Sequence, residues 1–430
     1  MKDRFDYKIS TQSQVARDHY VEAVDLVLAA QAGIVDTFEK VVEADPSFAL
    51  GYVGLARGKQ YGGSVADAKI AMEKARTLTK GLNAREQSHL NAFGLLIGGK
   101  GPEAYSAIRS HVDLYPRDAL IAQTCSSVFG LIGFSGKPGR EAEMLAYNAA
   151  LLPHYGEEWW CLSQYAFSLC ETGNVDKAST IIDKSLRLNP RNANGAHVRS
   201  HVYYEMGETQ PGKDYLDSWL ENYDRAASLY GHLSWHSALW SLERGDEKDM
   251  WNRIAIDIHP SVSLSLPINT LTDMASILYR AELAGVSVPK QYWIDISAYA
   301  QRFFPNTSLG FIDIHAALAH AMCGDEEVLR GIIESPNSLT GDLVTPIAEA
   351  YKCIADHKWE EGVNLLSSAM SDHARLGGSR AQRDVLEFSL LGALLKLGKT
   401  DEARRILLLR RPVLFNTQSL LGMNVQQRSH

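Results

Sequence analysis

The chain has 430 residues, of which 45% are hydrophobic and 22% are charged, and its formal net charge is −8 at pH 7. This balance excludes a polybasic protein, so we expect neither a nucleic acid nor a membrane surface as a partner. Residues 1–20 are too polar for a secretory signal, and no run approaches the roughly 18 apolar residues that span a bilayer. We therefore expect a cytoplasmic protein.

The cysteines support the same expectation. They are odd in number, widely spaced, and without any C-x-x-C pair. This usage predicts reduced, structural thiols rather than a disulfide framework or a cysteine zinc site. The five residues are Cys125, Cys161, Cys170, Cys323 and Cys353.

In chain order, residues 1–45 are expected to form a helical hairpin. Apolar and small residues recur at helical spacing over 11–32, and a second helix over 34–43 stops before Pro46. From there glycines mark helix–helix turns at intervals of 34 to 40 residues, and the triplet Asp356-His357-Lys358 fills the one double interval. The turn glycines are Gly62, Gly98, Gly133, Gly173, Gly207, Gly245, Gly285, Gly324 and Gly398.

Prolines mark the other boundary, between one repeat and the next, as in DPSFA, YPRDA, LPHYG and NPRNA. Proline after one helix and glycine at helix ends, repeated at this period, are typical of a helical-hairpin solenoid. The most readable unit spans 159–190. We predict an all-α, TPR-like α-solenoid of about eleven helical hairpins in a right-handed superhelix. Residues 1–430 form one continuous domain in this interpretation, with 412–430 as a C-terminal cap or tail.

Two histidine pairs stand out on the expected first helices of consecutive units. His197 and His201 are four residues apart, as are His232 and His236, and the pairs are 35 residues apart in the chain. This spacing puts each pair on one helix face and predicts that the two pairs lie on neighbouring helices and face the same way. Counting back from the turn glycines places Trp235 and His315 on the same concave side.

These residues allow more than one interpretation. A single histidine on a repeat helix is usually a packing residue, whereas several at equivalent positions can converge on a site. Asp313 is a candidate carboxylate base, although its spacing of two residues from His315 argues against a direct pair. Neither pair has the glutamate of H-E-x-x-H, so we assign no metal ligand and no cofactor, while noting that histidines with Asp313 would suit zinc, iron or manganese.

A second candidate region is 374–388, where two glycines precede a helix. Ser379 is the expected N-cap, and Arg380 and Arg383 follow in the first turn, where a carboxylate or phosphate could bind. The alternative is an ordinary repeat loop in which Arg383 or Asp384 makes an ion pair between helices. Arg280 is a further candidate for binding an anion.

Several stretches resemble one known family. LNAREQSHLNA, AHVRSHVYYEMG, HLSWHSALWSLERGD, SILYRAELAGVSV, FIDIHAALA and RLGGSRAQRDV are not generic repeat consensus. Through them the chain resembles the tetratricopeptide repeat protein 38 family over nearly its whole length, departing from its pattern around Asp313. The resemblance implies an all-helical, soluble, cytoplasmic repeat protein and no particular activity. The matching positions are His197, His201, His232, Trp235, His236, His315, Gly377, Gly378, Ser379, Arg383 and Asp384.

The sequence thus favours a binding protein whose concave interior, lined by histidine, tryptophan and arginine, holds a small anionic molecule or a peptide segment. The first alternative is a hydrolase- or lyase-type enzyme that uses a histidine of the same cluster, or a bound metal, for acid–base chemistry. The second is a scaffold whose groove grips an extended tail of a partner protein. The ligand and the oligomeric state do not follow from the sequence.

Overall fold

The computed structural model describes residues 1–414 and 417–423 of the chain. Within these residues the protein is all-α, with 22 α-helices, and the only β interaction is an isolated bridge between Lys2 and Lys8. The helices follow one another as eleven consecutive pairs, which confirms the predicted TPR-like α-solenoid. None of the described helices combines the length and the apolar character that crossing a bilayer requires.

The chain divides into two compact units. Unit 1 comprises 1–132, 141–198 and 223–229. Its helices are α1 (Gln14–Leu28), α2 (Ile34–Ala44), α3 (Ala49–Tyr61), α4 (Val65–Arg76), α5 (Ala84–Ile97), α6 (Gly101–Leu114), α7 (Ala119–Ala122), α8 (Arg140–Tyr155), α9 (Trp159–Glu171), α10 (Val175–Leu188) and the first part of α11 (Ala193–Met206).

Unit 2 comprises 133–140, 199–222 and 230–430. Besides the end of α11, its helices are α12 (Thr209–Leu220), α13 (Tyr230–Glu243), α14 (Glu247–Arg253), α15 (Pro267–Leu283), α16 (Lys290–Phe303), α17 (Gly310–Cys323), α18 (Glu326–Glu334), α19 (Gly341–Ala355), α20 (Trp359–Ala369), α21 (Arg380–Lys396) and α22 (Thr400–Arg410). The π-helical segment η1 (Ile254–Ile258) extends α14, and η2 (His373–Leu376) and η3 (Pro412–Leu414) are short 3₁₀ turns.

The predicted turn positions are mostly confirmed. Gly62 and Gly98 are the C-caps of α3 and α5, and Gly324 ends α17 with a left-handed φ of 87°. His357 takes over this role where glycine is missing, with φ 60° between α19 and α20. Glycine is favoured at such positions because it has no Cβ to clash in the left-handed region.

The prediction fails at Gly133, where no helix ends. The helix of that repeat, α7, stops after four residues at Ala122, and the chain continues without a helix as far as α8. Glycines at 130, 133, 136 and 139 and a proline at 138 disfavour a helix there. The hydroxyl of Thr124 also bonds the carbonyl of Ile121, a local contact that competes with helix continuation.

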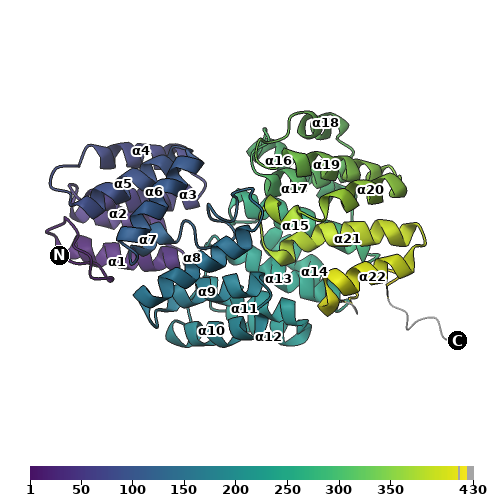
Figure 1. Ribbon diagram of the computed structural model, residues 1–430, viewed down its shortest axis with the longest axis horizontal. Coiled ribbons are helices and arrows are strands. Elements are labelled where there is room, and N and C mark those ends of the chain that lie inside the picture. The colour runs from purple at the N-terminus through teal and green to yellow at the C-terminus, as the bar shows by residue number, and fades with distance from the viewer. Residues whose placement is uncertain (415–416, 424–430) are drawn as a thin grey trace. The chain divides into compact units, whose positions relative to one another are not determined.

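In unit 1, α1 to α6 form three successive pairs (Figure 1). The predicted N-terminal hairpin is present as α1 and α2, slightly shorter at its first helix than the expected 11–32. Phe38 of α2 lies so close to Gly54 of α3 that a Cβ there would meet its ring at 2.0 Å. Glycine therefore sets the close approach of these two helices.

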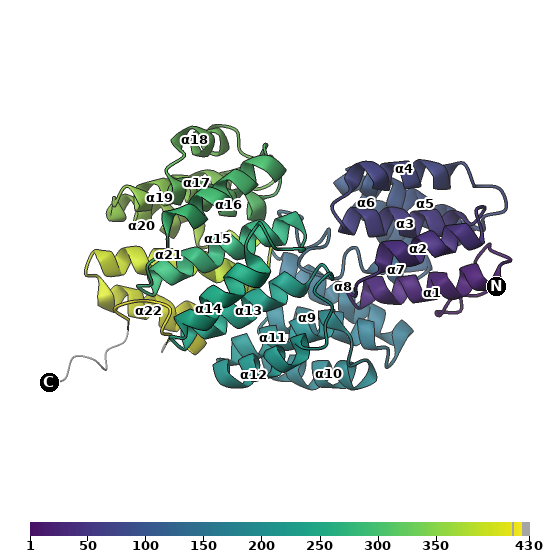
Figure 2. The same cartoon turned by 180° about the vertical axis from the view of Figure 1, so that it is seen from behind.

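In unit 2, the first helices of successive pairs pack on one another: α13 on α15, α15 on α17, and α17 on α19. Figure 2 shows α16 to α20 as neighbouring helices of this stack. The exception to nearest-neighbour packing in unit 2 is α21, which also packs on α15, three pairs earlier. One continuous core joins these helices, and residues of α21 such as Phe388 fill space that the sequence interpretation left to a concave groove.

The C-terminal region begins with η3 and continues through 417–423, where the amide of Leu421 donates to the carbonyl of Leu283 at 2.8 Å. Leu420 and Met423 are buried in the unit 2 core. The described part of the predicted 412–430 cap thus packs on unit 2. The remainder of that prediction, 415–416 and 424–430, lies outside the described residues.

Candidate functional site

Three of the predicted histidines meet in the interior of unit 2. His201 lies on α11, and His232 and His236 lie on α13; all three are at most 2% exposed. The ring of His236 lies 4.7 Å from that of His201 and 4.9 Å from that of His232, centroid to centroid. The prediction that neighbouring helices bring histidines of both pairs together is confirmed for these residues.

His197, the fourth member of the predicted pairs, belongs to unit 1. It precedes His201 by one turn on α11, and its ring contacts Phe167 of α9 edge-on at 5.5 Å.

A carboxylate that the sequence did not single out orients the cluster. Nδ1 of His232 lies 2.9 Å from each carboxylate oxygen of Asp273 on α15. Because a carboxylate only accepts, this contact places the proton on Nδ1 and makes Nε2 the unprotonated nitrogen of His232. Trp235 stacks on the other side of His232 at 5.2 Å, with the ring planes 14° apart. Burial raises the pKa of Asp273, and the neighbouring His232 opposes this shift.

The buried environment makes the predicted histidine bases weak. Burial, followed by the charge of His232, lowers the pKa of His201 to about 3. Burial lowers the pKa of His315 to about 4, and the hydrogen bond that its Nδ1 donates to the carbonyl of Phe311 only partly offsets this. An effective general base has a pKa near the working pH, so neither imidazole is suited to that role in this state.

Asp313 and His315 do not form a pair, as their spacing predicts. Asp313 accepts hydrogen bonds from the amide of Ser308 at 3.0 Å and from the side chain of Asn337 at 2.7 Å. Burial raises its pKa to about 6 in spite of these two bonds. Asp313 lines a cleft of about 470 Å³ that also contains His320, seven residues further along the same helix.

In the candidate region 374–388 two glycines precede a helix as predicted, but the side chains of this region bond to other groups of the protein. Ser379 is the N-cap of α21 and forms a capping box with Gln382. Arg383 donates to the carbonyl of Gly378 at 2.5 Å and is 3% exposed. Arg380 lies 3.7 Å from Glu205. These arginines therefore stabilise the approach to α21, and none of them lines a described pocket.

Arg280 has a different environment. Its guanidinium is 2% exposed and donates to the hydroxyl of Ser276, the carbonyl of Ala381 and the hydroxyl of Tyr204. It also lies over the ring of Phe388 at 5.1 Å. Within the described residues no carboxylate lies within ion-pair distance of this guanidinium. Burying a charge without a direct counter-charge costs free energy, so Arg280 stays a candidate for binding an anion.

Arg280 also borders a pocket of about 280 Å³ within unit 2. Apolar and polar side chains share the walls, and residues after α22 line one side. Among the described lining residues the acidic one is Glu243, whose Oε2 accepts hydrogen bonds from the hydroxyls of Thr417 and Ser419. The full lining is Tyr204, Gly207, Thr209, Leu239, Trp240, Glu243, Arg280, Phe388, Val413, Leu414, Thr417 and Ser419.

A buried ion-pair network that the sequence analysis missed lies next to this pocket. Arg411 binds both oxygens of Glu205, at 2.8 and 2.9 Å, and also contacts Asp384 at 2.9 Å. The hydroxyl of Tyr204 donates to Asp384 at 2.8 Å and accepts from Arg280. The inter-helix ion pair predicted as an alternative for Asp384 is thus confirmed, with Arg411 as its partner.

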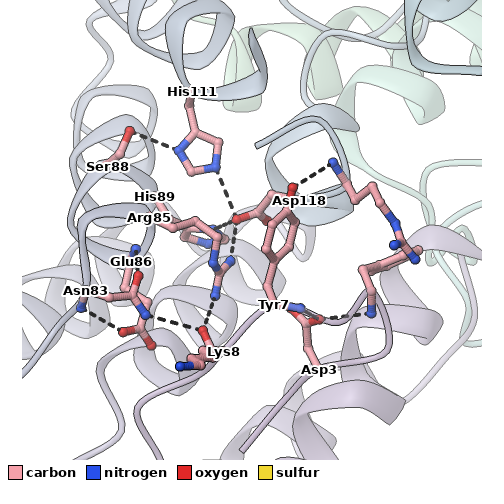
Figure 3. A network of polar contacts seen from close by, with 12 residues as sticks. Asp3, Tyr7, Lys8, Asn83, Arg85, Glu86, Ser88, His89, His111 and Asp118 are labelled. Atoms are coloured by element: carbon pink, nitrogen blue, oxygen red, sulfur yellow. Dashed lines mark hydrogen bonds and ion pairs between the residues drawn. The ribbon is translucent and has the colours of Figure 1, made fainter. Parts of the chain in front are cut away.

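Unit 1 has a polar centre of its own (Figure 3). One carboxylate oxygen of Asp118 accepts hydrogen bonds from Arg85 at 2.5 Å, His89 at 2.9 Å and His111 at 3.1 Å. Burial acts to raise the pKa of Asp118, but the charges of His89 and Arg85 and these bonds outweigh it and hold the pKa well below its usual range. Burial lowers the pKa of His89.

The same centre holds the N-terminal segment in place. Arg85 donates to the carbonyl of Lys8 at 3.2 Å and lies over the ring of Tyr7 at 5.0 Å. The amide of Ser10 donates to Glu86 at 2.8 Å. His89 lies on α5, nine residues before the turn glycine Gly98, whereas Asp118 lies in the turn before α7 and carries no periodic signal.

These features define an all-α helical-repeat protein of the TPR type with two buried polar centres. No family model matches the chain, so the resemblance to the tetratricopeptide repeat protein 38 family stays a prediction. Solved structures to which the chain is similar include a human IFIT1 dimer with m7Gppp-AAAA, at 14% identity and TM-score 0.46, over 96% of this chain and 93% of the other. Yeast Tom70 is similar at 15% identity and TM-score 0.36, over 90% of this chain and 82% of the other.

Proposed function

We propose that the protein is a helical-repeat binding protein whose unit 2 holds the carboxylate group of a small anionic molecule or of a peptide end in the Arg280 pocket. The observation that carries this proposal is the buried guanidinium of Arg280, which borders the pocket without a direct acidic partner. A carboxylate matches the forked N–H geometry of arginine and would supply the missing counter-charge.

The walls of the pocket support a ligand with an apolar part. Leu239 and Trp240 line it from α13 and Phe388 lines it from α21, and Val413 and Leu414 line it from the C-terminal segment. A volume of about 280 Å³ is at the lower end for small-molecule sites and suits a ligand of about the size of an acylated amino acid. Apolar contacts would supply affinity, and the guanidinium would orient the charged end.

The test compares three probes by thermal shift and calorimetry: succinate, N-acetyl-leucine, and a short peptide that ends in leucine, with either a free or an amidated carboxyl group. We expect N-acetyl-leucine or the free-acid peptide to bind, and the amidated peptide to bind at least ten-fold more weakly. A preference for N-acetyl-leucine identifies a small-molecule site, whereas a preference for the peptide identifies capture of a chain end.

Variants of two arginines complete the design. Arg280→Met keeps most of the side-chain volume and should weaken binding of the preferred probe at least ten-fold, while Arg280→Lys should be intermediate because it keeps the charge and loses the fork. Arg330→Met, at an exposed position of α18 in the same unit, is the control. Equal affinity for the acid and the amide, or an unchanged affinity in Arg280→Met, would refute the proposal.

The enzyme alternative has one observation in its favour, which differs from the predicted histidine cluster. Asp313, with a pKa raised to about 6 by burial, and His320 line the same cleft of about 470 Å³. A carboxyl group with a pKa near 6 is suited to acid–base chemistry near neutral pH. Hydrolysis of p-nitrophenyl acetate with a pH–rate inflection near 6, lost in Asp313→Asn, would support this alternative, and identical profiles would remove it.

A further inference from the structure

The geometry of the histidine cluster points to a function that the sequence left unassigned. We propose that His201, His232 and His236 bind a divalent transition-metal ion such as zinc, and that this ion joins α11 to α13 inside unit 2. The site would be separate from the Arg280 pocket, since none of the three histidines lines it.

The first argument is the convergence of donor atoms. One ring nitrogen from each of the three histidines lies within 4.8 Å of those of the other two. Ligand nitrogens around tetrahedral zinc are about 3.4 Å apart, as follows from Zn–N bonds of about 2.1 Å. Small rotations of the rings are enough to close this difference. Imidazole nitrogen is a preferred ligand of zinc, and three such groups leave a fourth position for a water or another donor.

The second argument is the orientation of His232. Its Nδ1 proton is held by both oxygens of Asp273 at 2.9 Å, so Nε2 is the nitrogen whose lone pair would bind a metal. A histidine that binds metal through one nitrogen and a carboxylate through the other is a recurring arrangement in zinc sites, where the carboxylate fixes the ring and increases its basicity.

The third argument is the contrast with unit 1. His89, His111 and Asp118 also bring three donor atoms within 4.8 Å of one another. There, however, both histidines and the guanidinium of Arg85 already bond to the same oxygen of Asp118. A second cation would face the charge of Arg85 at contact distance. In unit 2 the carboxylate of Asp273 bonds to Nδ1 of His232, and the ring nitrogens of the three histidines converge without sharing one acceptor oxygen of that carboxylate.

The test begins with the full chain purified without a nickel column or chelator, and its zinc content is measured by mass spectrometry. We expect about one zinc per chain, reduced to background in His201→Gln and His236→Gln. His373→Gln is the matched control, since His373 is in the same unit and its Nδ1 donates to the carbonyl of Met370. Zinc that persists at full stoichiometry in both cluster variants would overturn the proposal.

A second measurement covers the case in which a cluster variant fails to fold. The wild-type chain is stripped by dialysis against a chelator and titrated with cobalt(II), which gives visible absorption bands typical of four-coordinate sites. Asp273→Asn keeps all three ligands and should weaken cobalt and zinc binding by 10- to 100-fold. Absence of zinc from the purified chain together with no cobalt binding at about 10 µM would refute the site, and an unchanged affinity in Asp273→Asn would remove Asp273 from it.

Discussion

The substitution Asp118→Asn tests whether unit 1 is built around a buried charge. The carboxylate is 5% exposed, and one of its oxygens accepts hydrogen bonds from Arg85, His89 and His111. Asparagine has nearly the same shape as aspartate, so the change removes the charge and creates almost no cavity. The buried guanidinium of Arg85 then loses its counter-ion, and a buried charge without its partner is strongly destabilising.

The magnitude follows from these contacts. A hydrogen bond to a charged group contributes about 1.5–3 kcal/mol and a neutral one about 0.5–1.5 kcal/mol, so three bonds lose about 3 kcal/mol in total. Breaking a buried ion pair typically costs about 3–5 kcal/mol, which agrees. For a unit of about 200 residues this corresponds to a fall in Tm of roughly 10 °C. We therefore expect a large effect on unit 1.

The assay is hydrogen exchange followed by mass spectrometry, because it reports α5 and α6 separately from the helices of unit 2. Exchange in α5, α6 and the N-terminal segment 1–10 should accelerate in Asp118→Asn at neutral pH. Asp113→Asn is the control, since Asp113 is exposed near the C-terminus of α6. A loss of protection no larger than in the control would show that the carboxylate of Asp118 is not the charged centre of this network.

Two further predictions concern unit 2. Gly378 has φ +70° and a Cβ there would meet Phe311 at 2.4 Å, whereas Gly398 has φ +73° and open space around it. We therefore expect Gly398→Ala to lower the free energy of unfolding by about 1 kcal/mol and Gly378→Ala to lower it by about 2–4 kcal/mol. Equal losses in urea titrations would refute the steric argument. Burial lowers the pKa of His320 to about 4, so the unfolded chain takes up this proton first. The contribution of His320 to the free energy of unfolding is therefore fully present above pH 6.5, and it falls by about 3 kcal/mol as the pH is lowered towards 4. His320→Gln should flatten the pH dependence in this window, whereas His154→Gln, at an exposed position, should not.

The sequence predicted the repeat architecture because its signals are local. A turn glycine or a boundary proline acts within one or two helical turns, so its effect does not depend on the rest of the chain. The prediction failed at Gly133 because the glycine pattern there marks a segment that forms no helix at all. The approach of His201 to His236 could be inferred for a similar reason, since a regular period fixes how neighbouring repeats face one another.

The partners of the candidate residues could not be inferred in this way. Asp273 meets His232 from the next repeat, 41 residues away, and nothing in its own surroundings marks it. The surroundings of Arg280 depend on α21, which packs on α15 from three pairs further along the chain. Packing between distant segments decides whether an arginine lies next to a carboxylate, and a local sequence pattern does not contain this information. The bond from Arg383 to the carbonyl of Gly378 was equally absent from the sequence pattern.

The two sites proposed in unit 2 share their supporting helices, and this has a measurable consequence. On α11, His201 precedes the pocket residue Tyr204 by three positions; on α13, His236 precedes the pocket residue Trp240 by four. Each pair is therefore about one helical turn apart on one face, so a metal that fixes α11 against α13 also fixes two walls of the pocket. Binding linkage is reciprocal, and zinc should strengthen binding of the preferred carboxylate probe by the same factor by which the probe strengthens zinc binding. Calorimetry of the probe with and without one equivalent of zinc measures this factor. An affinity for the probe that is identical in both states would mean that the pocket is already rigid without the metal and that the sites act independently.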